Sequence, residues 1–257
     1  MKYLDLFSQR TTVRSYSDRT LSTADLDSLL KAASHAPTTG NMQLCTAVVT
    51  RERNEIELLA PYHFNQPCLH TAQAVITFCA DVYRFERWCA VSNAKPDFRN
   101  LQSLLASFFD ATIFAQQFCT LAELNGLGTC YLGTTTYNAA PIAKSLNLPE
   151  GVIPVLTVTV GYPAELTQTD AGRLPAEAVV HHSSYRHYTD SEICALYKEK
   201  ESRPDSQQFI KDNNKETLAQ VFTDIRYPGK TSDPFSVAFA DFLNNAGFKG
   251  FESYSNE

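Results

Sequence analysis

The spacing of apolar residues divides the chain into alternating helices and strands. It predicts helices over residues 21–37, 55–62, 101–125, 138–149 and 233–248, with further helices near 190–202 and 207–222. It predicts strands over residues 45–52, 72–83, 126–133 and 151–163. The run over 72–83 has no polar alternation, which is typical of a strand buried on both faces.

Two of the predicted helices carry more detailed signals. Ser22 or Thr23 can cap the helix over 21–37, and Pro37 ends it. The helix over 101–125 is apolar on more than one face, at Leu104, Leu105, Phe108, Phe109, Ile113, Phe114 and Phe118. Because a helix with one wet face keeps that face polar, this pattern indicates either a central core helix or part of a subunit interface.

The order of these elements predicts an α+β fold. About four strands, separated and followed by helices, give a small mixed sheet that is covered by helices on both faces. We expect residues 1–257 to form a single domain. After Pro163 the strands stop, so residues 164–257 are expected to be a C-terminal helical extension of that domain.

Composition and charge exclude several classes of protein. Apolar residues make up 44% of the 257, which is enough for a substantial core. The net charge of -6 is scattered along the chain and argues against a nucleic-acid partner. No apolar run resembles a signal peptide or approaches a membrane span. Seven cysteines, an odd number without a CxxC motif, indicate reduced thiols in a cytoplasmic protein.

Four polar segments interrupt the apolar pattern, and each has two interpretations. The first holds Arg10, Thr12 and Arg14, where two guanidinium groups and a hydroxyl suit a phosphate, although a solvated N-terminal segment is the commoner reason for so short a charged run. The second is APTTGNMQLC, residues 36–45, where Asn and Gln suit the edge of a heterocycle, although a polar turn that caps its own backbone has the same composition.

The third segment includes a predicted strand and the residues that follow it, and the fourth comes after the last predicted strand. In GLGTCYLGTTT, residues 126–136, the first two glycines can end the long helix, whereas Gly133 and Thr134 lie where a missing side chain lets a planar ligand approach the backbone. In TDAGRLP, residues 169–175, a lone Arg173 in a loop is typical of a surface residue, and its meaning depends on the other segments. We find no nucleotide-binding fingerprint, metal motif or catalytic triad.

Taken in order, these segments resemble the FMN-dependent nitroreductase family. The family pattern is an Arg-rich N-terminal box, a helix, S-P-S-S-x-N-x-Q-P, a strand, the long helix and GLG-x-x-Y-x-G; here the second motif reads APTTGNMQL. The segments RLP and VVHHSSY are similar to the subgroup of oxygen-insensitive major nitroreductases and NADPH-flavin oxidoreductases. The resemblance covers residues 1 to about 190 well and the C-terminal helices loosely.

The resemblance implies an intertwined homodimer with FMN at the subunit interface and the long helix as an interface element. It implies that the cofactor-binding residues are Arg10, Thr11, Thr12, Val13, Arg14, Thr38, Asn41, Gln43, Gln66, Pro67, Cys68, Tyr131, Leu132, Gly133, Thr134 and Arg173. The phosphate and ribityl chain would be held by Arg10 to Arg14 and Arg173. The isoalloxazine ring would be reached at its edge by Gln66 and lined by Tyr131 to Thr134, and Thr38 would come from the other subunit.

The implied activity is hydride transfer from NADPH or NADH through FMN, by a ping-pong mechanism, to nitroaromatics, quinones or free flavin. No catalytic side chain is needed, because the cofactor carries the chemistry. Two alternatives stay open. One is a flavoenzyme of the same fold with other chemistry, such as reductive dehalogenation or flavin destruction, and the other is a non-catalytic module that binds FMN.

Several positions depart from the family pattern. Ala171 replaces a Lys that usually precedes the Arg of RLP, and Leu44 replaces the Pro that usually follows the Gln. Where the subgroup has an Arg pair for the NADPH 2′-phosphate, this chain has only Lys211 and Lys215. The preference between NADH and NADPH is therefore left open.

Overall fold

The computed structural model describes residues 4–165 and 172–251, and the chain divides into two compact units. Unit 1 consists of Met1–Thr11 and Gln168–Pro234, and unit 2 of Thr12–Thr167 and Phe235–Glu257. The organisation as one domain with a C-terminal extension stays a prediction.

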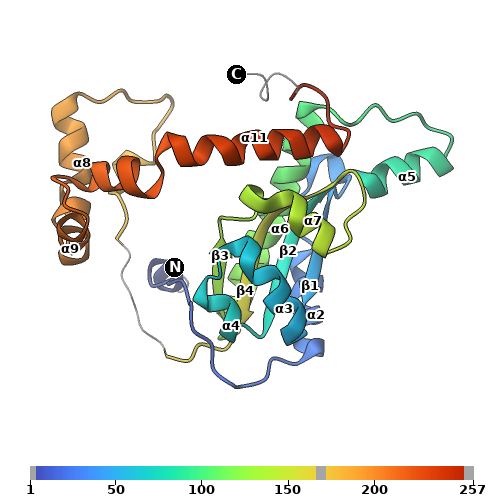
Figure 1. Cartoon of the computed structure of the whole chain (residues 1–257), viewed down its shortest axis with the longest axis horizontal. Helices are drawn as coiled ribbons and strands as arrows, with labels where there is room; N and C mark the ends of the chain where they lie inside the picture. Colours follow the sequence, from blue (N-terminus) through green and yellow to red (C-terminus); the bar gives the residue numbers. More distant parts are fainter. Residues whose placement is uncertain (1–3, 166–171, 252–257) are drawn as a thin grey trace. The chain divides into compact units, whose positions relative to one another are not determined.

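Unit 2 is built on one four-stranded sheet (Figure 1). Its strands are β1 (Cys45–Thr50), β2 (Ala74–Asp81), β3 (Gly128–Leu132) and β4 (Val152–Gly161), in the order β1-β2-β4-β3. The α+β fold class is confirmed, but each of the three pairings is antiparallel, so the expectation of a mixed sheet was wrong in this respect. Parallel strands need a long connection such as a helix, but a helix can also connect antiparallel strands. The alternation of helices and strands along the chain therefore does not determine strand direction.

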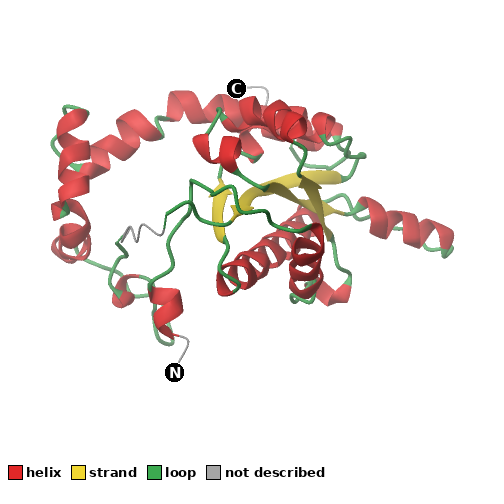
Figure 2. Cartoon of the chain, turned by 90° about the horizontal axis from the view of Figure 1, so that it is seen from below, coloured by secondary structure: helices red, strands yellow, loops and turns green. Residues whose placement is uncertain are grey.

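The helices of unit 2 lie on both faces of this sheet (Figure 2). They are α2 (Thr23–Ala33), α3 (Arg53–Leu59), α4 (Pro67–Thr71), α6 (Leu101–Leu124), α7 (Ala139–Ser145) and the C-terminal part of α11 (Gly229–Asn245), whereas α5 (Tyr83–Val91) projects away from the sheet (Figure 1). Short 3-10 turns form at η1 (Thr39–Asn41), η2 (Ala60–His63) and η3 (Thr136–Asn138). The Ser22 side chain caps α2 as expected, whereas α4 and α5 are additional to the helices expected from the sequence.

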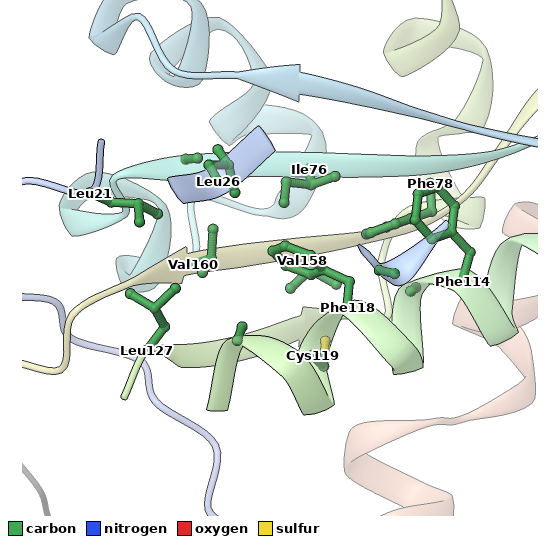
Figure 3. Packing of buried hydrophobic residues seen from close by; sticks show 14 residues of the cluster. Leu21, Leu26, Ile76, Phe78, Phe114, Phe118, Cys119, Leu127, Val158 and Val160 are labelled. Atoms are coloured by element: carbon green, nitrogen blue, oxygen red, sulfur yellow. The ribbon is translucent and has the colours of Figure 1, made fainter. Parts of the chain in front are cut away.

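Helices α2 and α6 pack on one face of the sheet around a core of buried apolar side chains (Figure 3). At its centre Phe78 of β2 meets Phe114 of α6 edge-on, with ring centroids 5.1 Å apart. By length and composition α6 could cross a membrane, but it contacts all four strands and is therefore a core helix.

The side of α6 that faces away from the sheet is also apolar. Leu105, Phe109 and Ile113, spaced by four residues, are 39%, 58% and 41% exposed. The core interpretation of the helix pattern is therefore confirmed for one face, while the other face is an exposed apolar stripe whose role in a subunit interface stays a prediction.

The opposite face of the sheet holds the second core. Side chains of α3, α4, β2 and β3 pack there with Val13 and Tyr16 from the N-terminal segment of unit 2. This cluster brings together three parts of the chain that the sequence had marked as candidate flavin ligands.

Unit 1 is helical in its described part. It contains α1 (Leu4–Ser8), η4 (Ala176–Ala178), α8 (Asp190–Ser202), α9 (Pro204–Asp212), α10 (Leu218–Gln220), a π-helical turn η5 (Val221–Arg226) and the start of α11. The expected helix over 207–222 is broken, because Asn214 takes a left-handed φ of 52° and Thr217 forms a capping box with Gln220.

Candidate functional site

The Arg-rich segment crosses the edge of the sheet at a pair of glycines. Gly128 of β3 and Gly161 of β4 are opposite one another in the register. A Cβ on Gly128 would lie 2.4–2.6 Å from the Val13 side chain, and a Cβ on Gly161 would lie 3.0–3.2 Å from Tyr16. The role of Gly128 is thus close packing rather than helix termination, which Gly126 provides with its φ of 77°.

Hydrogen bonds hold this segment in place. The Val13 N–H donates to the Thr129 carbonyl at 3.0 Å. The Tyr16 hydroxyl donates to the Val13 carbonyl at 3.0 Å and lies 2.7 Å from the Thr159 hydroxyl. Burial raises the pKa of Tyr16 far above its ordinary value, so it stays a neutral donor. The backbone on either side of Arg14 is fixed, while its own side chain is exposed.

Two thiols connect this segment to α4 and β3. Cys68 and Cys130 are buried in the same cluster as Val13. The hydrogen bond from the Cys130 thiol and, to a smaller extent, the charge of Arg14 lower the pKa of the Cys68 thiol. The same bond raises the pKa of Cys130. The candidates Val13, Arg14 and Cys68 therefore share one environment, and Tyr131 and Leu132 follow Cys130 directly along β3.

Residues 62–64 and 134–138 form three successive contacts, which we call the loop ladder. The Tyr62 carbonyl accepts a hydrogen bond from Asn138 at 2.7 Å. His63 Nδ1 shares a hydrogen bond of 3.0 Å with the Thr134 hydroxyl. The Phe64 ring meets the Tyr137 ring edge-on. The ladder fixes the segment that leads into Gln66 against the segment that follows β3.

His63 is a residue that sequence reasoning missed. It is fully buried, and its Nε2 has no hydrogen-bond partner among the described residues. Burial lowers its pKa to about 4, so the imidazole is neutral near pH 7. The only sign of a role in the sequence was its position three residues before the candidate Gln66. A single His between aromatic residues forms no recognisable motif.

The loop over residues 38–44 is organised by a second residue that the sequence analysis missed, Asp110 of α6. Its Oδ1 accepts from the Thr39 N–H at 2.8 Å and from the Thr39 hydroxyl at 3.0 Å, and its Oδ2 accepts from the Leu44 N–H at 3.0 Å. Asp110 is 1% exposed and is the only charged residue between Leu101 and Ala122. That isolation in an apolar helix was the signal for a buried acceptor.

The same contacts explain a departure from the family pattern. Leu44 is fully buried and donates its backbone N–H to Asp110. A Pro at this position would have no N–H to donate. In the same loop Asn41 and Gln43 have positive φ angles of 56°, and their side chains hydrogen-bond each other at 3.3 Å. Their polarity therefore serves the loop itself as well as any ligand.

The strand order separates the candidates of unit 2 into two groups. One group lies at the edge of the sheet that β3 forms. It consists of Thr12, Val13, Arg14, Gln66, Pro67, Cys68, Tyr131, Leu132, Gly133 and Thr134. Thr38, Asn41 and Gln43 precede β1, which is the other edge. Three strand spacings, about 14 Å, lie between the two edge strands. One chain therefore does not unite Thr38 with the β3-edge group.

The remaining candidates, Arg10, Thr11 and Arg173, belong to unit 1. The Arg173 guanidinium donates to the carbonyl of Gly172 at 2.8 Å, and its approach to a phosphate stays a prediction. Ala171 lies outside the described residues. Lys215, a candidate for the nicotinamide phosphate region, pairs with Asp224 at 2.8 Å.

Comparison with known proteins identifies relatives over most of the chain. The model of the nitroreductase family matches residues 7–162. An FMN reductase (NADPH) of Bacillus subtilis is 29% identical over 181 residues, 70% of this chain and 72% of that protein. A second B. subtilis protein, FMN reductase [NAD(P)H], is 30% identical over 179 residues, 68% of this chain and 70% of that protein.

A solved structure extends the similarity to the C-terminal part. The crystal structure of a protein from Bacteroides fragilis NCTC 9343 superimposes with a TM-score of 0.93 at 46% identity. It covers 96% of this chain and 100% of that one. The C-terminal helices, for which the sequence resemblance was loose, thus have a counterpart in a solved structure.

Proposed function

This chain belongs to the nitroreductase family, and we propose that it is an FMN-dependent oxidoreductase that uses NAD(P)H to reduce nitroaromatics, quinones or free flavin. The relatives named as FMN reductases that accept NADPH or NAD(P)H support this activity. The observation that carries the proposal is the convergence of the Arg14, Cys68 and Thr134 segments at the β3 edge. We propose a soluble, cytoplasmic enzyme, with its thiols reduced.

The residues at the β3 edge fit a flavin mononucleotide. Arg14 offers an exposed guanidinium whose backbone is fixed on both sides, which suits a phosphate. A Cβ on Gly133 would meet nothing within 4 Å, so there is open space beside the backbone where β3 ends. Tyr131 is 40% exposed next to it. A cationic end and an open, aromatic end match the two ends of FMN.

We propose that two copies of the chain complete the site. The 38–43 loop precedes the edge strand opposite the one that carries Tyr131, so a second copy of the chain would bring such a loop to the β3 edge. The exposed stripe of Leu105, Phe109 and Ile113 on α6 supports a homodimer, because such stripes are typical of subunit interfaces. Asp110, on the same helix, would couple the interface to the loop.

Within this proposal each residue has a physical role. FMN held there would supply the redox chemistry, taking reducing equivalents from NAD(P)H to an acceptor. Arg14 and the unit 1 arginines Arg10 and Arg173 supply positive charge for the phosphate. Gln66 offers an amide that both donates and accepts at the ring edge. The hydrogen bond from His63 holds the Thr134 segment against residues 62–64. Because the imidazole is neutral, it adds no charge beside Thr134.

The test is reconstitution followed by reduction. We expect the purified protein to bind FMN and become yellow, to bleach anaerobically with NADPH or NADH, and to recover its colour when menadione or a nitroaromatic is added. A protein that stays colourless with excess FMN would contradict the proposal. A yellow protein that neither nicotinamide bleaches would favour a non-catalytic FMN-binding module.

Sharing of the site between chains has its own test. Arg14→Ala and Thr38→Trp chains, each with a different affinity tag, are co-expressed in equal amounts. Half of the dimers are then mixed, and each mixed dimer has one site with both defects and one intact site. About a quarter of the wild-type FMN content and activity should return. No recovery, with mixed dimers confirmed by tandem purification, would place both residues in a site formed by one chain.

A further inference from the structure

Two free thiols from distant parts of the chain meet beside Arg14. Cys68 of α4 and Cys130 of β3 belong to the same cluster in unit 2, and the Cys130 thiol donates a hydrogen bond to the Cys68 sulfur. The two residues are 2% and 3% exposed, whereas the Arg14 side chain beside them is exposed. The thiol pair therefore lies just beneath the surface at the β3 edge.

The thiol pair is the centre of a small polar network. Thr159 of β4 is opposite Cys130 in the register, so the two side chains share one face of the sheet. The Thr159 hydroxyl donates to the Cys68 sulfur and lies 2.7 Å from the Tyr16 hydroxyl. A free Cys usually serves as a small apolar core residue, as the fully buried Cys79 does. Packing alone does not explain two thiols that hydrogen-bond each other and a hydroxyl.

The two thiols differ in reactivity. The hydrogen bond from Cys130 and, to a smaller extent, the charge of Arg14 lower the pKa of the Cys68 thiol, while the same hydrogen bond raises the pKa of Cys130. The thiolate is the reactive form of Cys, so Cys68 is the nucleophile of the pair. Cys130 is already in contact with it, in the position of a resolving thiol.

We propose that Cys68 and Cys130 form a reversible disulfide when the protein meets hydrogen peroxide. The Cys68 thiolate attacks one peroxide oxygen: an S–O bond forms, the O–O bond breaks, and the departing hydroxide takes a proton to become water. The Cys130 sulfur then attacks the Cys68 sulfur, and the displaced hydroxide leaves as a second water with the Cys130 proton. The two thiols lose two electrons and two protons in all, and one peroxide becomes two waters.

The disulfide would join two segments of the proposed flavin site. Gln66 and Pro67 directly precede Cys68, and Tyr131 directly follows Cys130. A covalent bond brings the two sulfurs closer than their hydrogen bond does, so α4 and β3 must shift towards each other. Oxidation should therefore weaken FMN binding. This consequence rests on the proposed function, whereas the disulfide itself does not.

Peptide mapping of the flavin-free wild-type chain is the main test. The reduced protein is treated with hydrogen peroxide and unfolded, its remaining thiols are blocked with N-ethylmaleimide, and the digest is analysed by mass spectrometry. We expect a Cys68–Cys130 linked peptide that dithiothreitol removes, with Cys79 still reduced. If Cys68 and Cys130 both stay reduced, or if Cys130 links to Cys119 instead, the inference is overturned.

Two variants test the order of attack. Cys130→Ser keeps a hydroxyl that can donate to Cys68, so oxidation should stop at a Cys68 sulfenic acid that dimedone labels. Cys68→Ser should leave Cys130 unlabelled, and labelling of Cys130 in that variant would overturn the assignment of Cys68 as nucleophile. Cys194→Ser, which removes the exposed thiol of α8, is the control and should form the disulfide like the wild type. If a variant does not fold, the wild-type map still decides.

FMN titration gives the second readout. The dissociation constant for FMN should be about tenfold higher after peroxide treatment, a usual size of coupling between two sites, and dithiothreitol should restore it. Peroxide should not change the FMN affinity of Cys130→Ala, which cannot form the disulfide. An equal FMN affinity in both redox states would contradict the link to the flavin site. If neither state binds FMN, the proposed function fails, and the peptide map decides the disulfide on its own.

Discussion

The two edges of the sheet in unit 2 hold their candidate residues by different means. At the β3 edge, Val13, Cys68, Cys130 and the loop ladder form many small contacts between four segments. At the β1 edge, one carboxylate, Asp110, fixes the 38–44 loop through three hydrogen bonds. The first arrangement distributes its stability over packing, and the second concentrates it in one residue. Single substitutions should therefore affect the two edges very differently.

Asp110→Ala should have the largest effect. It leaves the Thr39 N–H, the Thr39 hydroxyl and the Leu44 N–H without their acceptor in a buried place. At roughly 1.5 kcal/mol for each hydrogen bond to a charged group, the loss is about 4.5 kcal/mol of unfolding free energy. Urea denaturation measures it, and hydrogen exchange at Thr39 and Leu44 should accelerate.

The matched control is Asp97→Ala, which removes a carboxylate that is 84% exposed and paired with Lys249. Its unfolding free energy should change by less than about 0.5 kcal/mol. If Asp110→Ala is as mild as this control, or if exchange at the Thr129–Leu132 amides accelerates equally, the distinction between the two edges is wrong.

The β3 edge was largely predictable from sequence because its signals are local. The Arg-rich segment, Gln66–Cys68 and Tyr131–Thr134 are each short, and the resemblance gave their order; the structure places their unit 2 members around one cluster. The strands and the long helix were also predicted, because their apolar runs are long and uninterrupted. The sheet directions were not, since pairing is a non-local property that helical connections leave open.

What the sequence could not supply were contacts between distant segments. Asp110 lies 66 residues from Leu44, and no spacing rule connects an acid in a helix to a loop so far away. The Gly128–Val13 contact was missed for the same reason, and Gly128 was assigned instead to the end of the helix. The sequence showed that Leu44 departs from the family pattern but not why; the reason is the hydrogen bond from its N–H to Asp110. Residues that hold a site together are therefore harder to predict than residues that face a ligand.

His63 should give the β3 edge a pH dependence. Its pKa is about 4 in the folded chain against 6.5 for an ordinary His. Between these values the unfolded chain binds a proton at this residue and the folded chain does not, so stability falls as the pH falls from 6.5 to 4. At about 1.4 kcal/mol per pH unit, the loss approaches about 3 kcal/mol at most.

The measurement is the unfolding free energy from urea denaturation at a series of pH values. His63→Asn has no titrating group and should show a flatter dependence between pH 4 and 6.5 than the wild type. Equal slopes in the wild type and His63→Asn would mean that His63 is not buried as a neutral group.

Gly128→Ala should lower the unfolding free energy by less, because several packed segments at the β3 edge can each shift slightly to make room for the added methyl group. The added methyl would lie within 2.6 Å of three Val13 atoms, including its Cβ, so the N-terminal segment must shift. Overpacking of this kind costs about 2 kcal/mol. Gly133→Ala is the matched control: nothing lies within 4 Å of its added Cβ, so the unfolding free energy of the apoprotein should be unchanged, while FMN affinity falls if the flavin lies against that backbone.

A double substitution shows whether the Val13 contact is the cause. Val13→Gly removes all three clashing atoms, so Val13→Gly combined with Gly128→Ala should be less destabilised than the sum of the two single changes, by about 1 kcal/mol or more. Val13→Ala keeps the Cβ that would lie 2.4 Å from the new methyl and should rescue much less. Strict additivity of Val13→Gly and Gly128→Ala would show that the segment carrying Arg14 is not positioned by this contact, and that the β3 edge depends on fewer residues than its packing indicates.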